Sequence, residues 1–401
     1  MSSLAVNFLG IPMASPVIGA SGTVGFGLEL AKFIDMKEIG AISGKGLAPT
    51  PWTGNNGTRI AETTSGMLNC IGLENPGAPY FLEHYLPEVK KLGCPYIANM
   101  VGKSVEEYAE CAKLLSVPGI SALEVNISCP NVKVGGAAFG TDPEQAAAVT
   151  RAVKDATDLP VIVKLSPNVT DVVTIAKAVE AAGADAISLI NTLLGIAIDT
   201  RTRTPILGNV TGGLSGPAIK PVALRMVWQV AKAVNIPVCG LGGVMTGEDV
   251  VEFMMAGAKT VQVGTANLAD PTAMARLVRE LDAWCDKNGV KDVNEMIGTL
   301  KALGMGNRAL QKMFVIRSSF VIIKGMFWGN VVGIGLCLLQ HCTGWISLSQ
   351  EGYFLTTVPI FIDWGWLALL NAATFLFIVA LLALPTMIIS LILPEKTIRF
   401  E

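Results

Sequence analysis

The chain has 401 residues, enough for one domain of about 250–300 residues and a further segment. Its formal net charge of −2 excludes a basic nucleic-acid-binding surface as the main feature. Eight cysteines without a C-x-x-C pair and only two histidines predict no metal or iron–sulfur site made by this chain alone. Scattered cysteines suit a reducing compartment, and the N-terminus lacks the features of a signal peptide, so we expect a cytoplasmic catalytic domain.

Short apolar runs alternate with helix-like segments along most of the chain. We predict strands at 16–20, 39–43, 95–100, 122–127, 161–165, 186–190, 237–241 and 260–263. We predict helices at 26–37, 79–92, 104–116, 143–156, 171–182, 217–234, 247–256 and 271–287. Eight successive β/α units of this size indicate an α/β fold, the (β/α)8 TIM barrel. The Gly-, Pro- and Asn-rich stretch 46–78 is a long insertion, which we interpret as a lid or binding loop.

The carboxyl ends of the predicted strands carry the candidate site, because TIM barrels place their chemistry there. Polar or glycine residues close all eight runs: Ser21, Lys45, Asn99, Asn126 with Cys129, Lys164, Asn191 with Thr192, Gly242 with Gly243, and Gly264 with Thr265. The two glycine-containing ends follow the seventh and eighth strands, where barrels often bind phosphate through backbone N–H groups. We therefore favour a phosphorylated cofactor over simple turns.

The segment 126–131 reads Asn-Ile-Ser-Cys-Pro-Asn and follows the fourth predicted strand. Pro130 stops that strand, so two amides, a hydroxyl and the thiol of Cys129 lie on one loop. A thiol in this position acts as a base or a nucleophile if its surroundings lower its pKa. A lone cysteine would more often be a small buried residue, but that interpretation leaves the polar cluster unexplained.

Taken together, these motifs resemble the class 1 dihydroorotate dehydrogenases over residues 4–297. The resemblance rests on SGTVGFG at 21–27, SGKGL at 43–47, NCIGLENPG at 69–77, NISCPN at 126–131, VKLSPN at 163–168, INT at 190–192, GGLSGPAIKP at 212–221, GLGGV at 240–244 and VQVGTA at 261–266. The NCIGLENPG form is similar to the catalytic subunit of the 1B subclass. Alternatives are another FMN barrel acting on dihydropyrimidines and, in a different class, a fragment of a membrane transport permease.

The resemblance implies an FMN-dependent oxidation of (S)-dihydroorotate to orotate in pyrimidine (UMP) biosynthesis. Cys129 would remove the C5 proton while a hydride passes from C6 to N5 of FMN, and Lys164 would stabilise charge at N1 and O2 of the flavin. The implied FMN-binding residues are Ser21, Lys45, Gly46, Asn99, Asn126, Lys164, Ile190, Gly216, Gly242, Gly243, Gly264 and Thr265. The implied substrate-binding residues are Lys45, Asn69, Cys70, Ile71, Gly72, Leu73, Asn126, Asn191 and Thr192.

The 1B subclass also implies a partner. FAD, a [2Fe–2S] cluster and NAD would be reached only through an iron–sulfur flavoprotein electron-transfer subunit. The family suggests a heterotetramer of two catalytic and two electron-transfer chains.

The residues after about 298 have a different character, so we predict domains at 1–298 and 299–401. Residues 325–350 and 364–394 contain no Asp, Glu, Lys or Arg. Each run is long enough to cross a hydrocarbon core, and we predict membrane spans at about 320–342 and 364–393. Basic residues precede the first span and follow the second, so both ends are expected in the cytoplasm.

The tail at 297–325 and 384–401 resembles the end of an FtsX-like permease of the lipoprotein-releasing type. Only the last two spans of such a permease are present, so this remnant should not transport anything alone. Three origins stay open: a membrane-anchored enzyme, a gene fusion or deletion accident, and an assembly artefact. The last two are favoured, and the enzymatic interpretation does not depend on the choice.

Overall fold

The structure is a computed structural model that describes residues 3–129, 137–298, 307–346, 358 and 360–391. The chain divides into two compact units, Met1–Ala302 and Leu303–Glu401, and each is described by itself. The predicted junction after residue 298 borders residues 299–306, which lie outside the described residues. Pro130 and Asn131 of the Asn-Ile-Ser-Cys-Pro-Asn segment lie outside them too.

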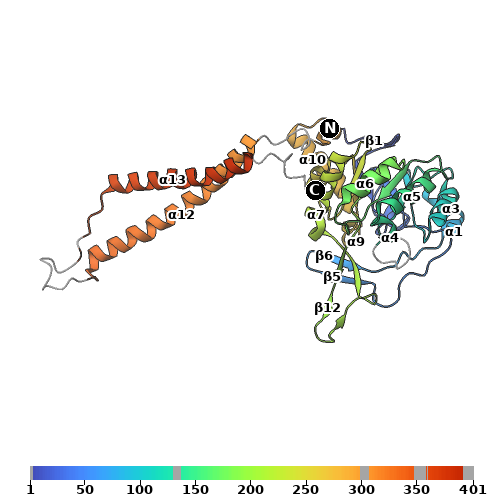
Figure 1. Cartoon of the computed structure of the whole chain (residues 1–401), viewed down its shortest axis with the longest axis horizontal. Coiled ribbons are helices and arrows are strands. Elements are labelled where there is room, and N and C mark those ends of the chain that lie inside the picture. The colour runs from blue at the N-terminus through green and yellow to red at the C-terminus, as the bar shows by residue number, and fades with distance from the viewer. Residues whose placement is uncertain (1–2, 130–136, 299–306, 347–357, 359, 392–401) are drawn as a thin grey trace. The chain divides into compact units, whose positions relative to one another are not determined.

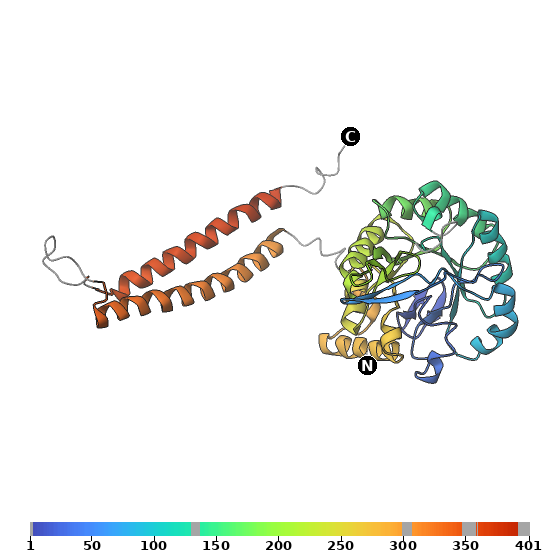
Figure 2. The same cartoon turned by 90° about the horizontal axis from the view of Figure 1, so that it is seen from below.

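The first unit contains a closed barrel of parallel strands, visible in Figures 1 and 2. Its strands are β3 (Val17–Gly19), β4 (Ala41–Ser43), β7 (Tyr96–Met100), β8 (Ala122–Asn126), β9 (Val161–Lys164), β10 (Ala186–Leu189), β15 (Val238–Leu241) and β16 (Thr260–Val263). They close in the order β10-β15-β16-β3-β4-β7-β8-β9. This arrangement confirms the TIM barrel and all eight predicted strands.

The barrel strands are apolar on both faces because helices cover the outside and side chains fill the inside. All residues of β8, β9, β10 and β16 are buried. The interior is not purely apolar, however. Ser43, Glu124, Lys164, Ser188 and Gln262 are buried polar residues on five of the strands. A buried charged pair such as Glu124 and Lys164 costs free energy unless its partners compensate, so we expect these residues to have a function.

Helices surround the barrel (Figure 2). They are α1 (Ala78–His84), α2 (Leu86–Val89), α3 (Val105–Leu115), α5 (Pro143–Lys154), α6 (Val172–Ala181), α7 (Lys220–Ala233), α8 (Gly247–Met255) and α10 (Ala273–Asn288). Side-chain caps begin several of them: the side chains of Ser104 and Asp142 accept from the N–H groups of Glu107 and Gln145. Shorter elements are β1 (Val6–Phe8), β2 (Ile11–Met13), α4 (Ala137–Gly140), α9 (Ala266–Ala269), η2 (Pro217–Ile219) and η3 (Val293–Met296).

The predicted helix at 26–37 is wrong. Only the 3-10 turn η1 (Leu30–Lys32) forms there. Gly25 and Gly27 have φ angles of 55° and 93°, in the left-handed region, so a right-handed helix cannot begin at this point. Gly25 instead contacts the chain just after β4, where the Lys45 N–H donates to the Gly25 carbonyl at 2.8 Å.

The insertion after β4 forms half of a four-stranded antiparallel sheet, which we call the lid sheet. Its strands are β5 (Ile60–Thr63), β6 (Gly66–Asn69), β11 (Leu193–Ile196) and β14 (Thr211–Ser215), in the order β11-β14-β6-β5. The prediction treated 46–78 as a loop and missed the partner strands after β10, together with the small hairpin of β12 (Ile198–Asp199) and β13 (Thr204–Pro205). Pairing of Asn69 with Gly213 joins segments 144 residues apart, which local sequence patterns do not reveal.

The second unit contains two long helices, α12 (Asn307–Thr343) and α13 (Trp364–Leu391), which lie side by side in Figures 1 and 2. Within the described residues, one helical segment is long and apolar enough to cross a membrane, Ile322–Thr343, with a mean hydropathy of 1.7. It overlaps the first predicted span. The second predicted span corresponds to α13, and its last residues, 392–393, lie outside the described part of the chain.

Candidate active site

A cavity of about 380 Å³ opens at the carboxyl ends of the barrel strands and beneath the lid sheet. Its size suits a small molecule or cofactor. The predicted site residues that line it are Ser21, Lys45, Gly46, Asn69, Ile71, Gly72, Leu73, Asn126, Cys129, Lys164, Ile190, Asn191, Thr192, Gly216, Gly242, Gly243, Gly264 and Thr265. Segments far apart in the sequence therefore meet at one place because the barrel is closed.

Two predicted residues, Asn99 and Cys70, do not line this cavity. Asn99 lies in the barrel interior, where its Nδ2 donates to Glu124 Oε2 at 2.7 Å. Cys70 follows Asn69 at the end of β6, and successive side chains of a strand point to opposite faces. Its thiol is fully buried and lies 3.5 Å from the Thr58 carbonyl oxygen. Cys70 therefore packs within the lid sheet region, and its predicted contact with substrate stays a prediction.

Sequence reasoning missed several lining residues: Ala20, Gly22, Thr23, Ile60, Met67, Glu74, Ser215, Ile219, Leu241 and Leu268. Ser215 and Ile219 belong to the quoted GGLSGPAIKP motif, so a closer use of that motif would have found them. Ile60 and Met67 gave no such signal, because their role depends on the lid sheet.

Glycines form a tight backbone wall at one end of the cavity. Gly216, Gly242 and Gly243 have φ angles of 98°, 130° and 76°, which other residues rarely adopt. A Cβ atom at Gly243 would lie 2.8 Å from the Gly216 carbonyl oxygen, so the two backbones approach too closely for a side chain. Such a wall exposes backbone groups to a ligand, as phosphate sites require.

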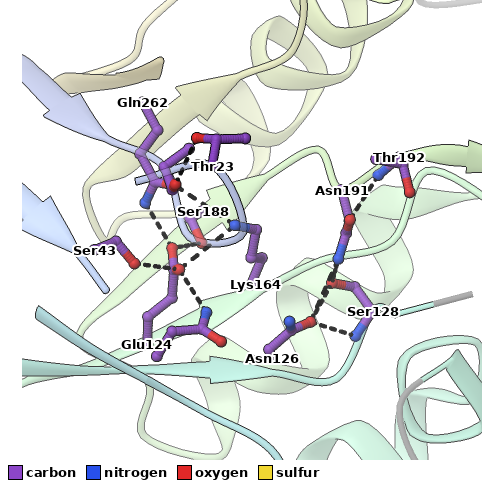
Figure 3. Close-up of polar contacts among 12 residues, drawn as sticks. Thr23, Ser43, Glu124, Asn126, Ser128, Lys164, Ser188, Asn191, Thr192 and Gln262 are labelled. Carbon is purple, nitrogen blue, oxygen red and sulfur yellow. Dashed lines mark hydrogen bonds and ion pairs between the residues drawn. The ribbon is translucent and has the colours of Figure 1, made fainter. Parts of the chain in front are cut away.

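A polar cluster lies at the ends of β8 and β10, on the right of Figure 3. Asn191 Nδ2 donates to Ser128 Oγ at 2.7 Å, and Ser128 Oγ donates to Asn126 Oδ1 at 2.9 Å. The Thr192 N–H donates to Asn191 Oδ1 at 2.7 Å, which fixes the orientation of that amide. The side-chain amides of Asn126 and Asn191 and the hydroxyl of Ser128 are thus fixed beside Cys129, which is only 7% exposed.

The titratable side chains that line the cavity, among the described residues, are those of Lys45, Glu74, Cys129 and Lys164. Burial lowers the pKa of Lys45 below its ordinary value, although nearby Glu74 partly opposes this and Arg59 adds to it. The two histidines of the chain, His84 and His341, lie in α1 and α12. Cys129 contributes the one thiol among these described lining side chains.

The Lys164 ammonium contacts a buried carboxylate, with its Nζ 3.5 Å from Glu124 Oε2 and 3.5 Å from Gln262 Oε1. Burial by itself raises the pKa of Glu124, but the charge of Lys164 and hydrogen bonds from Gln262, Ser188 and Ser43 outweigh it and lower that pKa. Lys164 and Glu124 thus form a buried salt bridge inside the barrel (Figure 3).

Comparison with known proteins decides the family. The sequence profile described as "Dihydroorotate dehydrogenase" matches residues 3–284. A relative from Geobacter metallireducens is 56% identical over 299 residues, covering 74% of this chain and 98% of the relative. The chain belongs to the dihydroorotate dehydrogenase family. Relatives from Desulforamulus reducens and Alkaliphilus metalliredigens are 54% and 52% identical over 297 and 298 residues, covering 74% of this chain and 98% and 99% of theirs.

All three relatives carry the name "Dihydroorotate dehydrogenase B (NAD(+)), catalytic subunit". The resemblance to the 1B subclass is thereby confirmed. A second profile, "FtsX-like permease C-terminal", matches residues 288–393, which confirms the resemblance of the tail.

The cavity of this dihydroorotate dehydrogenase fits FMN, the cofactor that the family implies. The glycine wall of Gly216, Gly242 and Gly243 would accept a phosphate, since a Cβ atom there has no room. Lys164 lines the same cavity and would face the electron-rich edge of a flavin. Ile190 and Leu241 add apolar surface for a planar ring system.

Proposed function

We propose that this chain is the catalytic subunit of an NAD-linked dihydroorotate dehydrogenase and oxidises (S)-dihydroorotate to orotate in pyrimidine biosynthesis. The observation that carries the proposal is the meeting of Cys129, Lys45 and Lys164 with the glycine wall in one cavity. A thiol base, two cations and a phosphate cradle are what a flavin-dependent removal of a proton and a hydride requires.

Cys129 would accept the C5 proton of dihydroorotate. That proton is acidified by the neighbouring ring carbonyl, so a modest base such as a thiolate suffices. Asn126 and Asn191 would hold the substrate, because their amides are already oriented by Ser128 and Thr192. Lys45 would supply positive charge for the substrate carboxylate. Loop residues Asn69 and Ile71–Leu73 would complete the substrate site from the lid sheet side.

FMN, when bound, supplies an acceptor for the hydride from C6. The backbone of Gly242, Gly243, Gly264 and Thr265 would hold its phosphate. Lys164 would offer its side-chain nitrogen to the flavin from the cavity wall.

The electrons would pass to NAD through a partner subunit that carries FAD and a [2Fe–2S] cluster. Support comes from the words "catalytic subunit" in the names of the relatives. We propose a heterotetramer of two catalytic and two electron-transfer chains.

The test is the spectrum of the purified chain. We expect a yellow protein with flavin absorbance that is bleached by dihydroorotate without oxygen, with formation of an equal amount of orotate. Dihydrouracil, which lacks the carboxylate, is the matched control and should not bleach it. A colourless protein that takes up no added FMN would contradict the proposal.

We further propose that α12 and α13 anchor the enzyme in a membrane, with both chain ends in the cytoplasm. Along α12, Phe327, Trp328, Val332 and Leu336 are exposed, which suits contact with lipid. Exposed tryptophans lie near the connecting segment: Trp345, Trp364 and Trp366. Tryptophans are enriched at membrane–water interfaces, so that end of the hairpin would reach the far side of the bilayer.

Membrane extraction tests this anchor. The expressed chain should stay with the membrane fraction after an alkaline wash and dissolve in detergent. Val332→Asp combined with Leu336→Asp should release it, because acidic residues in a span are costly, whereas Val332→Ala with Leu336→Ala should not. Release of the unaltered chain by the wash would contradict the anchor.

A further inference from the structure

Six strands of the barrel converge on one carboxylate, that of Glu124 on β8. Its Oε2 accepts hydrogen bonds from Ser43 Oγ at 2.8 Å and Asn99 Nδ2 at 2.7 Å. Its Oε1 accepts from Ser188 Oγ at 2.8 Å and Gln262 Nε2 at 2.6 Å. Lys164 on β9 completes the set, and the Glu124 residue is fully buried. The left side of Figure 3 shows this arrangement.

The distances separate two kinds of partner. The four neutral donors lie within 2.8 Å of the carboxylate, whereas the Lys164 ammonium lies at 3.5 Å, at the long limit of a hydrogen bond. The carboxylate is therefore fixed in place by neutral groups and attracts Lys164 by charge. The ammonium keeps N–H groups for a ligand, and Lys164 lines the cavity that Glu124 does not reach.

We propose that Glu124 is a positioning residue that holds Lys164 as a fixed cation at the wall of the cavity, where the flavin would bind. This inference rests on the proposed function. The Lys164 side chain is only 5% exposed, and burial disfavours a charged group unless an opposite charge compensates it. Glu124 supplies the opposing charge without contacting the ligand.

Few other titratable groups surround this pair in the described residues. Cys239 on β15 is close to both charges, and burial raises its pKa to about 12, so it stays a neutral thiol. On the cavity side, Lys45, Glu74 and Cys129 line the same space. The competing explanation is that Glu124 merely joins the strands. The two explanations differ in how ligand binding depends on pH.

Glu124→Gln in the full chain is the decisive variant, because it keeps the shape of the side chain and removes its charge. Lys164 should then lose its proton in mildly alkaline buffer. We expect the Kd for FMN, measured by flavin fluorescence, to be roughly tenfold higher at about pH 9 than at about pH 6. The wild type should change by less than about twofold. The midpoint potential of the bound flavin should fall below that of the wild type only at the alkaline end.

Two further variants identify the titrating group. Ser43→Ala removes one hydrogen bond to Glu124 but leaves both charges, so its FMN binding should be as independent of pH as that of the wild type. Glu124→Gln combined with Lys164→Met should show no rise in the Kd for FMN at alkaline pH, because the group that titrates is gone. A purely structural role would weaken binding equally at both pH values.

Each result decides the proposal. FMN binding by Glu124→Gln that is independent of pH would overturn it. If Glu124→Gln fails to fold, the wild type still tests the proposal. A loss of FMN affinity in the wild type at alkaline pH, absent from Lys164→Met, would show that Glu124 does not keep Lys164 charged. A wild-type chain that binds no FMN would overturn the proposed function itself, which is a different outcome.

Discussion

The hydroxyl oxygen of Thr265 lies 2.9 Å from that of Ser215. Thr265 follows the last barrel strand, β16, and Ser215 ends β14 of the lid sheet. Both residues line the cavity, so this contact connects the barrel to the lid sheet at the end where a phosphate would bind.

Ser215→Ala should raise the Kd for FMN. One hydrogen bond between neutral groups contributes about 0.5–1.5 kcal/mol, which corresponds to roughly 2- to 13-fold. Flavin fluorescence titration measures the change. Thr202→Ala is the matched control, since Thr202 and Thr204 form a similar hydroxyl pair at 2.8 Å that is exposed on the small hairpin. Equal effects of the two variants would refute this role of Ser215.

Cys129→Ala should keep FMN and lose oxidation of dihydroorotate, because the proposed base is gone. Cys129→Ser should be slow and partly rescued at high pH, since a hydroxyl is a much weaker base. Stopped-flow bleaching of the flavin measures both. Cys94→Ala is the control, because Cys94 does not line the cavity. Full activity of Cys129→Ala would remove Cys129 from the mechanism.

Substrate binding should weaken in alkaline buffer because of Lys45. Burial lowers the pKa of this lysine, so it loses its charge at a pH below its ordinary pKa of 10.5. As the pH rises through that lowered pKa, the KM for dihydroorotate should increase. Lys45→Arg should show a KM that stays constant over the same range, since a guanidinium keeps its charge. A wild-type KM that is equally constant would argue against contact between Lys45 and the substrate carboxylate.

Asn330 and Asn371 form a reciprocal amide pair between α12 and α13. Asn330 Nδ2 lies 2.7 Å from Asn371 Oδ1, and Asn371 Nδ2 lies 3.2 Å from Asn330 Oδ1. In the proposed membrane anchor, such a pair would contribute about 0.6–2 kcal/mol. Asn330→Leu and Asn371→Leu should each speed protease cleavage of the tail in mild detergent. The double variant should be less affected than either, because neither amide is left without its partner. A double variant that is cleaved fastest would contradict the pairing.

Periodicity and strand-end residues were enough to predict the barrel. Apolar runs of strand length recur eight times, and closed parallel barrels require such runs. The same reasoning failed at 26–37, because two glycines override the helical pattern. It also failed for the lid sheet, whose strands pair across 144 residues. Glu124 was read only as part of a strand, since nothing in its local sequence indicates that it points into the barrel.

The sequence by itself determined the family, the barrel and the majority of the cavity residues, because motifs at strand ends keep their order along the chain. Only the tertiary structure decided which side chains face the cavity and which lie behind it. Asn99, Cys70 and Glu124 depend on which face of a strand they occupy. That face is set by packing between distant segments, which chain order does not encode.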